Sequence, residues 1–398
     1  MPALPEIDLT DPAVLRDPFT AQGLARERSP LARLLVPGMP PMWGVMRYAE
    51  GRAVLSDPAR FALNPATFAF KPKVADELQP YVRSMQEMEG PEHARLRKLV
   101  APAFTPRRAA EFQPRIEAIV EELLDDLVKH ATDGPADLIT YLARPLPMAV
   151  ICELVGIPVH HRPRWQEYGA ALAAGAGSAF TDAMPGIIAG AEDAVAARRA
   201  EPRDDIVSDL VRAQAEDGDR LSDVELVALV WQLVLGGQTP TNLLANGVEA
   251  LFTHPDQLAA LRADPELAPR AVEELMRWCG PQLLAFPRHT TQDVELAGVR
   301  IPQGEPVVVA IAAANRDPRV FADPDTLDVT RTGSAAHLGF AHGPHFCLGA
   351  SFARVQAQVA LTALLRRAPG LTLAVAPDEV QRASDGGTWR LAALPVTL

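Results

Sequence analysis

The stretch FAHGPHFCLGASFAR, residues Phe340–Arg354, places one cysteine on a glycine-containing loop that leads directly into a helix. Gly343 and Gly349 flank Cys347, which is typical of a tight turn with positive φ or of backbone that a flat ligand approaches closely. Apolar residues at helical spacing follow, so Cys347 is expected at or just before a helix N-terminus. The dipole and free N–H groups of that helix would stabilise a thiolate.

Three interpretations of this cysteine are open from the residues alone. An isolated cysteine beside a turn is commonly a buried free thiol. His342, His345 and Cys347 offer zinc ligands, but no second ligand pair at finger-like spacing follows, and such closely spaced ligands would strain a tetrahedron. The third interpretation is a haem iron bound by one cysteine thiolate.

The order of Phe340, Gly343, Cys347 and Gly349, F-x-x-G-x-x-x-C-x-G, resembles the haem-binding loop of the cytochrome P450 family. The similarity extends over essentially the whole chain and is to the soluble bacterial branch. It implies a single domain, residues 1–398, that is mainly α with small β regions. In this fold heme b lies between a long central helix and the cysteine loop, and Cys347 would bind the iron.

The same resemblance implies which side chains hold the cofactor. His93 and Arg97 lie four residues apart in GPEHARLRKLV, and hence on one helix face. By themselves they are typical of a solvated or salt-bridged surface. In the family this helix faces the haem propionates, which imidazolium and guanidinium groups would neutralise. The expected cofactor-binding residues are His93, Arg97, Arg288, His345, Phe340, Gly343 and Gly349.

A long helix is expected to follow the capping box of Ser222 and Glu225 and to run through LVALVWQLVLGGQTPTNLLANGVEALFTHP. Its middle breaks the rules of helix formation. Gly236 and Gly237 each cost about 1 kcal/mol against alanine, and Pro240 removes the N–H that would reach the Gly236 carbonyl. A well-packed helix gains no stability from such a defect, so the defect indicates a functional use of this position.

The segment LGGQT, residues 235–239, resembles the A-G-x-[DE]-T signature of the family's central helix. Thr239 is then the alcohol expected to assist oxygen chemistry. Gln238 departs from the pattern, because a neutral amide holds water but cannot relay a proton as a carboxylic acid does. Sliding the register by one would place Thr239 at the acid and Pro240 at the threonine, a larger departure. Thr239 and Gln238 are the expected catalytic residues.

Several other segments carry expectations. Glu274 and Arg277 form an everyday i,i+3 pair by spacing, whereas the resemblance makes them a structural ion pair behind the haem loop with Arg331 as third partner. The loop with Phe61, Phe68 and Phe70 is ordinary packing, or, by the resemblance, a cover over the substrate. Trp389 is either buried or directed toward the pocket.

Composition limits the partners. The formal charge of −12 argues against a general nucleic-acid binder. Three scattered cysteines cannot form a disulfide framework, which indicates a reducing compartment. No apolar run approaches the roughly 20 residues of a membrane span, so a cytoplasmic protein is expected.

The resemblance implies a monooxygenase that hydroxylates or epoxidises a small organic substrate, such as a bacterial secondary metabolite. Ferredoxin and ferredoxin reductase would supply electrons, with Arg95, Lys98 and Arg354 either docking the ferredoxin or forming solvated surface. Replacement of the acid by Gln238 leaves oxidative C–C or C–N coupling as an alternative. A haem sensor or carrier without turnover is the alternative from another class.

Overall fold

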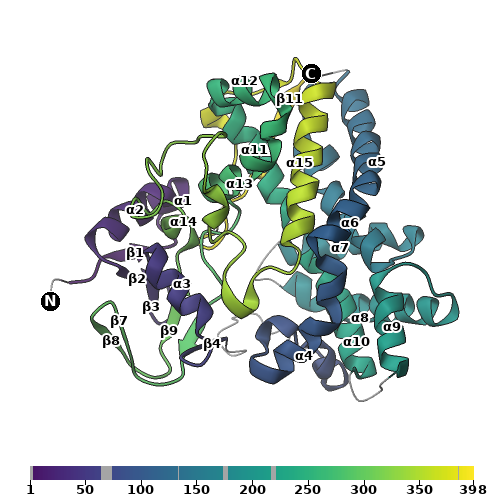
Figure 1. Cartoon of the computed structure of the whole chain (residues 1–398), viewed down its shortest axis with the longest axis horizontal. Helices are drawn as coiled ribbons and strands as arrows, with labels where there is room; N and C mark the ends of the chain where they lie inside the picture. The colour runs from purple at the N-terminus through teal and green to yellow at the C-terminus, as the bar shows by residue number, and fades with distance from the viewer. Residues whose placement is uncertain (1–2, 64–73, 133, 174–177, 217–220, 384) are drawn as a thin grey trace.

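The structure is a computed structural model that describes residues 3–63, 74–132, 134–173, 178–216, 221–383 and 385–398. Phe68 and Phe70 lie outside the described residues. Helices fill most of the chain and strands gather at one side (Figure 1). The α-helices are α1 Pro12–Arg16, α2 Pro18–Arg28, α3 Tyr48–Ser56, α4 Gly90–Val100, α5 Pro106–His130, α6 Pro145–Val155, α7 Arg162–Ala173, α8 Ser178–Ala200, α9 Ile206–Glu216, α10 Asp223–Gly236, α11 Pro240–Thr253, α12 Pro255–Ala263, α13 Ala268–Cys279, α14 Ile311–Ala314 and α15 Ala350–Arg367.

The largest sheet joins the N-terminal part of the chain to a segment more than two hundred residues later. Its strand order is β1-β2-β3-β9-β6-β4, and β3 pairs in parallel with β9, Trp43 opposite Val307. Its strands are β1 Glu6–Asp8, β2 Leu31–Leu35, β3 Met42–Val45, β4 Phe61–Leu63, β6 Arg288–Thr290 and β9 Pro306–Val309. Smaller sheets contain β5 Ala136–Asp137, β10 Thr372–Leu373 and β11 Pro395–Thr397, and β7 Val294–Leu296 with β8 Val299–Ile301.

The helical core is built around α15, the helix that follows the cysteine loop. α15 packs against α5, α13 and α11, and Figure 1 shows α5 beside it. Apolar residues at helical spacing on α5 and α15 are buried, among them Ile116, Leu124 and Leu364. The loop before α15 is therefore anchored to the largest hydrophobic cluster of the described residues.

The central helix is interrupted where the sequence predicted a defect. The capping box of Ser222 and Glu225 starts α10, which ends at Gly236, and α11 begins at Pro240. Gly237 permits close packing on α6, because a Cβ atom there would lie 2.5 Å from Ile151 Cγ1. The expected single long helix is thus two helices, since Pro240 cannot donate the hydrogen bond that would join them.

α10 also holds the segment before α4 in place. Trp231 Nε1 donates to the Tyr81 carbonyl at 3.0 Å. The Gln232 amide accepts from the Met85 N–H at 2.9 Å and donates to the Arg83 carbonyl at 3.3 Å. Three side-chain hydrogen bonds from two adjacent residues therefore fix the backbone of this segment against the central helix.

Two expectations about apolar side chains are resolved by burial. Phe61 is buried in β4, in agreement with ordinary packing. Trp389 is buried as well, with its ring edge-on to Phe19 at 5.3 Å, so the interpretation as a core tryptophan is confirmed. Across the residues described, we find no helix with both the length and the apolar character needed to cross a bilayer.

Candidate active site

The cysteine loop is a short, backbone-bonded turn that ends at the start of α15. The Cys347 N–H donates to the Phe340 carbonyl at 2.8 Å, and the Phe346 N–H donates to Gly343 at 3.0 Å. Gly349 is the N-cap of α15, so Cys347 lies two residues before it. This position confirms the one predicted from the sequence, and the Cys347 side chain is exposed whereas Cys152 and Cys279 are buried.

The two glycines of the loop serve different purposes. Gly343 has φ +74°, and a Cβ atom there would lie 2.6 Å from the Leu55 carbonyl oxygen of α3. Gly343 therefore has the positive φ expected for a tight turn, and the backbone that approaches it closely is that of α3. Gly349 has φ −80°, so the positive φ considered for it is wrong. A Cβ atom on Gly349 would point into open space, which leaves room for a flat group beside the backbone.

Opposing effects act on the Cys347 thiol. Desolvation by surrounding protein raises its pKa, even though part of the side chain reaches solvent. Backbone N–H groups of Gly349 and Ala350 and the charges of Arg97 and Arg354 act in the other direction. The N–H groups at the helix start therefore favour the thiolate as expected, but desolvation of the anion is the larger effect and the net shift of the pKa is upward.

Four predicted cofactor residues come together from three distant parts of the chain. The rings of His93 on α4 and His345 on the loop stack with centroids 4.2 Å apart. His345 Nε2 lies 2.9 Å from Glu89 Oε2, and Arg288 Nη1 lies 3.9 Å from Glu89 Oε1. Arg97, one turn after His93, donates to the Phe346 carbonyl at 2.5 Å. The cluster is rich in N–H donors directed at one region beside the loop.

Glu89 is the member of this cluster that the sequence did not indicate. It is the N-cap of α4 and accepts from the Leu63 N–H at 3.0 Å. Burial acts to raise its pKa, but hydrogen bonds from His345 and Leu63 outweigh burial and lower it. Its only signal in the sequence was an acid directly before the Gly90-Pro91 start of α4.

The protonation of His93 differs from the sequence-based expectation of an imidazolium. Burial, the neighbouring His345 and the charge of Arg97 lower the pKa of His93 to about 4. A neutral imidazole follows at pH 7, and it still donates one N–H. Arg97 and Arg288 bring positive charge to the cluster without His93, and Arg288 is only 3% exposed.

Thr239 and Gln238 occupy the break between α10 and α11. The Thr239 hydroxyl donates to the Gly236 carbonyl at 3.0 Å and so satisfies the acceptor that Pro240 leaves without its usual partner. The Gln238 amide donates to the Leu235 carbonyl at 3.3 Å. It also lies directly against α7, because a Cβ atom on Gly169 would come within 1.8 Å of Gln238 Oε1.

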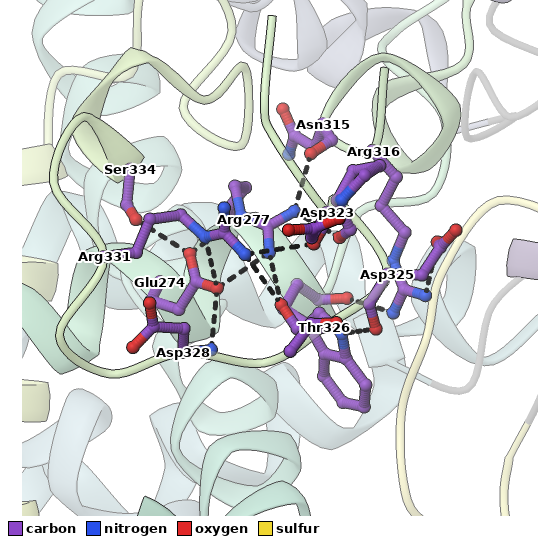
Figure 2. Close-up of polar contacts among 12 residues, drawn as sticks. Glu274, Arg277, Asn315, Arg316, Asp323, Asp325, Thr326, Asp328, Arg331 and Ser334 are labelled. Carbon is purple, nitrogen blue, oxygen red and sulfur yellow. Dashed lines mark hydrogen bonds and ion pairs between the residues drawn. The ribbon is translucent and has the colours of Figure 1, made fainter. Parts of the chain in front are cut away.

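Behind the loop, Glu274 and Arg277 form a buried bidentate pair with two contacts of 2.7 Å, and both side chains are fully inaccessible (Figure 2). Arg331 Nε donates to Glu274 at 3.0 Å, which confirms Arg331 as the third partner. Arg277 also donates to the backbone carbonyls of Asn315, Pro324 and Thr326. The everyday surface salt bridge suggested by spacing alone is wrong, because the neighbouring meander covers the pair.

The comparisons with known proteins agree with this arrangement. The family model for cytochrome P450 matches residues 176–368. Mycinamicin IV hydroxylase/epoxidase from Micromonospora griseorubida is 42% identical over 369 residues, covering 92% of this chain and 91% of that protein. The chain belongs to the cytochrome P450 family. Cytochrome P450 monooxygenase PikC from Streptomyces venezuelae is 40% identical, covering 96% and 91%. The solved P450 CxnD, described as an enzyme for C–S bond formation, has a TM-score of 0.85 at 35% identity, covering 96% and 94%.

Membership of the P450 family makes this chain an oxidoreductase of the monooxygenase type with a haem iron, a redox partner and a small substrate. The residues present fit a haem. Cys347 is an exposed thiol that forms no disulfide, and Gly349 leaves space beside the loop. Arg288 Nε is a buried donor without a protein partner, as a propionate-binding group requires.

The zinc interpretation is not supported. The described part of the P450 chain contains no group of three or more His, Cys, Asp or Glu side chains placed to hold a metal ion. His342 lies with Nε2 3.3 Å from Arg52 on α3. Of the cations considered for ferredoxin docking, Arg95 pairs with Glu225 and Arg354 pairs with Glu273, whereas Lys98 is exposed.

Proposed function

We propose that this P450 is a haem-thiolate monooxygenase that hydroxylates or epoxidises a small organic molecule, a bacterial secondary metabolite by analogy with its relatives. The observation that carries the proposal is the exposed Cys347 thiol, fixed by the Phe340 carbonyl and by the start of α15. Cys347 would bind the iron of heme b through its sulfur. When bound, the haem supplies activation of dioxygen and the oxidising power. The relatives' names, a hydroxylase/epoxidase and a monooxygenase, support this reaction class.

The cluster around Glu89 would bind the haem propionates. Arg97 and Arg288 supply positive charge, and the neutral ring of His93 and the stacked ring of His345 supply N–H donors. Phe340, Gly343 and Gly349 would shape the backbone beside the macrocycle. We propose that residues 1–398 act together as one domain, because β3 and β9, from opposite ends of the chain, lie in one sheet.

Thr239 would act on protons at its hydroxyl. The hydroxyl now donates its hydrogen bond to the Gly236 carbonyl, and rotation about χ1 would free it to donate to another acceptor. Gln238 offers an amide that can orient water but cannot exchange a proton as an acid does. Proton supply would therefore pass through water held by these residues rather than through a carboxylic acid.

This last point supports a second candidate function. The absence of an acid at position 238 departs from the pattern of an oxygen-inserting enzyme and leaves room for oxidative coupling within the substrate. C–C or C–N coupling is the candidate, and the similarity to CxnD, named for C–S bond formation, lends it support. Turnover under labelled dioxygen distinguishes the two, because oxygen insertion places the label in the product and coupling places it only in water.

The proposed electron donors are ferredoxin and ferredoxin reductase. Exposed Lys98 lies one residue after Arg97, and Phe346 beside Cys347 is 39% exposed, so this face offers an apolar centre with a cation nearby. Reversal of charge in Lys98→Glu should slow the reduction of this P450 by ferredoxin and weaken the dependence of that rate on salt. An unchanged rate would mean that the donor docks elsewhere.

The first test of the whole proposal is the absorption spectrum of the reduced protein with carbon monoxide, beside Cys347→Ser. A strongly red-shifted Soret band that requires the cysteine is expected. A band of the histidine-ligated type in both samples would overturn the assignment of Cys347.

A further inference from the structure

Behind the cysteine loop, a second buried acid lies next to Glu274 on α13. Glu273 is 14% exposed and forms a bidentate pair with Arg354 of α15, with one contact of 3.0 Å from Arg354 Nη2. The guanidinium of Arg354 lies over the ring of Phe340, 4.5 Å from its centroid. A carboxylate on one helix therefore holds a cation against the aromatic residue that begins the cysteine loop.

His337 completes this arrangement from the other side. Its Nδ1 accepts from the Gly339 N–H at 3.1 Å, which places the proton of a neutral imidazole on Nε2. Nε2 lies 3.3 Å from Glu273 Oε2, although it is not aligned for a full hydrogen bond. The His337 ring packs at 5.5 Å from the ring of Phe340. Phe340 thus has His337 and Arg354 as polar neighbours, and both are directed at Glu273.

Glu273, Arg354 and His337 are linked to Cys347 by a backbone hydrogen bond of Phe340 and by electrostatic interaction. The Phe340 carbonyl accepts the Cys347 N–H at 2.8 Å, so the position of Phe340 sets the position of the cysteine backbone. The positive charge of Arg354 acts on the Cys347 sulfur and favours negative charge there. Glu273 opposes that charge with its own. Burial acts to raise the pKa of Glu273, but the interactions with His337 and Arg354 outweigh burial and lower it to about 2, so Glu273 is ionised at neutral pH.

We propose that Arg354, held by Glu273, is a positioning residue that tunes the electron donation of the Cys347 sulfur to its metal. The inference rests on the proposed ligation of haem by Cys347. The positive charge of Arg354 acts on the sulfur and stabilises the extra electron of the reduced centre, whereas the carboxylate of Glu273, paired with Arg354, offsets that charge. The balance of the pair sets the reduction potential, and the contact with Phe340 fixes the geometry through which it acts.

The test is a double-mutant cycle of the haem reduction potential in the holoenzyme. Arg354→Ala removes the cation and leaves Glu273 negative, so the potential should fall. Glu273→Gln keeps the shape and an acceptor oxygen but leaves Arg354 unopposed, so the potential should rise. The double variant should return close to the wild-type value, and Arg354→Lys, which keeps the charge, should restore most of what alanine loses.

Arg366 supplies a matched control on the same helix. It pairs with Glu121 of α5, and it lies 12 residues beyond Arg354, about 18 Å along α15 at 1.5 Å per residue. Arg366→Ala removes a charge of the same sign and an ion pair of the same kind, and should leave the potential unchanged. Unfolding midpoints measured alongside report the purely structural cost of each change.

The outcomes separate this inference from the function on which it rests. A wild-type protein without a thiolate-type carbon monoxide spectrum would refute the ligation by Cys347. A normal spectrum with Arg354→Ala and Glu273→Gln shifting the potential in the same direction, or not at all, would refute the role of the pair. If Arg354→Ala does not retain haem, the sign of the shift in Glu273→Gln decides, and the absence of a rise overturns the proposal.

Discussion

Replacing Glu274 by glutamine should destabilise the protein far more than any exposed ion pair does. The carboxylate accepts five hydrogen bonds, two from Arg277 and one each from Arg331, Ser334 and the Asp328 N–H. Glutamine keeps the volume but presents an N–H₂ group to some of these donors. It also leaves the Arg277 side chain, which is fully inaccessible, without its counter-ion.

The magnitude follows from the burial of both partners. Removing one member of a buried ion pair costs about 3–5 kcal/mol, because the remaining charge stays desolvated. The backbone carbonyls that also accept from Arg277 prevent complete loss of its hydrogen bonds. With an unfolding entropy of roughly 2.1 cal/mol/K per residue, the loss lowers the Tm of the 398-residue chain by about 4–6 °C.

The assay is urea unfolding of the holoenzyme followed by circular dichroism, with Glu111→Gln as control. Glu111 pairs with Arg107 on the surface of α5, where the arginine side chain is 88% exposed, so this change should cost less than about 0.5 kcal/mol. Equal losses in the two variants, or a loss below about 1 kcal/mol for Glu274→Gln, would refute the reasoning from burial.

Other expectations concern the loop, the central helix and acid stability. Gly343→Ala should abolish stable folding of the loop, because it combines φ +74° with a Cβ atom 2.6 Å from the Leu55 oxygen. Gly349→Ala should fold and lose only haem affinity. The haem content and Tm of the two purified variants test this, and equal Tm values would contradict it. Gly169→Ala must displace Gln238 and should increase the reductant consumed per product formed, with Gly190→Ala in α8, whose Cβ atom would meet Trp165 at an ordinary 3.4 Å, as control. Thr239→Val removes the bond to Gly236 and should also uncouple turnover, while Thr239→Ser should restore it; a fully coupled valine variant would exclude the hydroxyl from proton supply. The pKa of Glu273 is lowered to about 2, so ionised Glu273 contributes on the order of 3 kcal/mol to the free energy of unfolding. This contribution is present above its unfolded pKa near 4.5 and is lost as pH falls toward 2. The stability of Glu273→Gln, measured by acid unfolding, should therefore fall less steeply between these pH values than that of the wild type.

Features set by neighbouring residues could be predicted from the sequence. The capping box at Ser222, the break before Pro240 and the cysteine two residues before the N-cap of α15 depend on local backbone rules, and the structure has all three. Glu274 and Arg277 could be paired by spacing, but their burial could not be seen, because the meander that covers them lies about fifty residues later.

Features that depend on distant segments or on desolvation were missed. Glu89 meets His345 across 256 residues, and no local pattern indicates that contact. The neutral state of His93 and the raised pKa of Cys347 both follow from burial, which periodicity does not measure at a loop. The value of φ at Gly349 was likewise undecided, since a glycine tolerates either sign.

The contacts of Trp231 and Gln232 with the segment before α4 have a consequence for how this enzyme can diversify. All three hydrogen bonds end on backbone atoms of Tyr81, Arg83 and Met85 rather than on their side chains. Any amino acid other than proline at position 85 keeps the same bonds. Point mutations can therefore change the side chains of this segment while its path over the central helix is inherited unchanged.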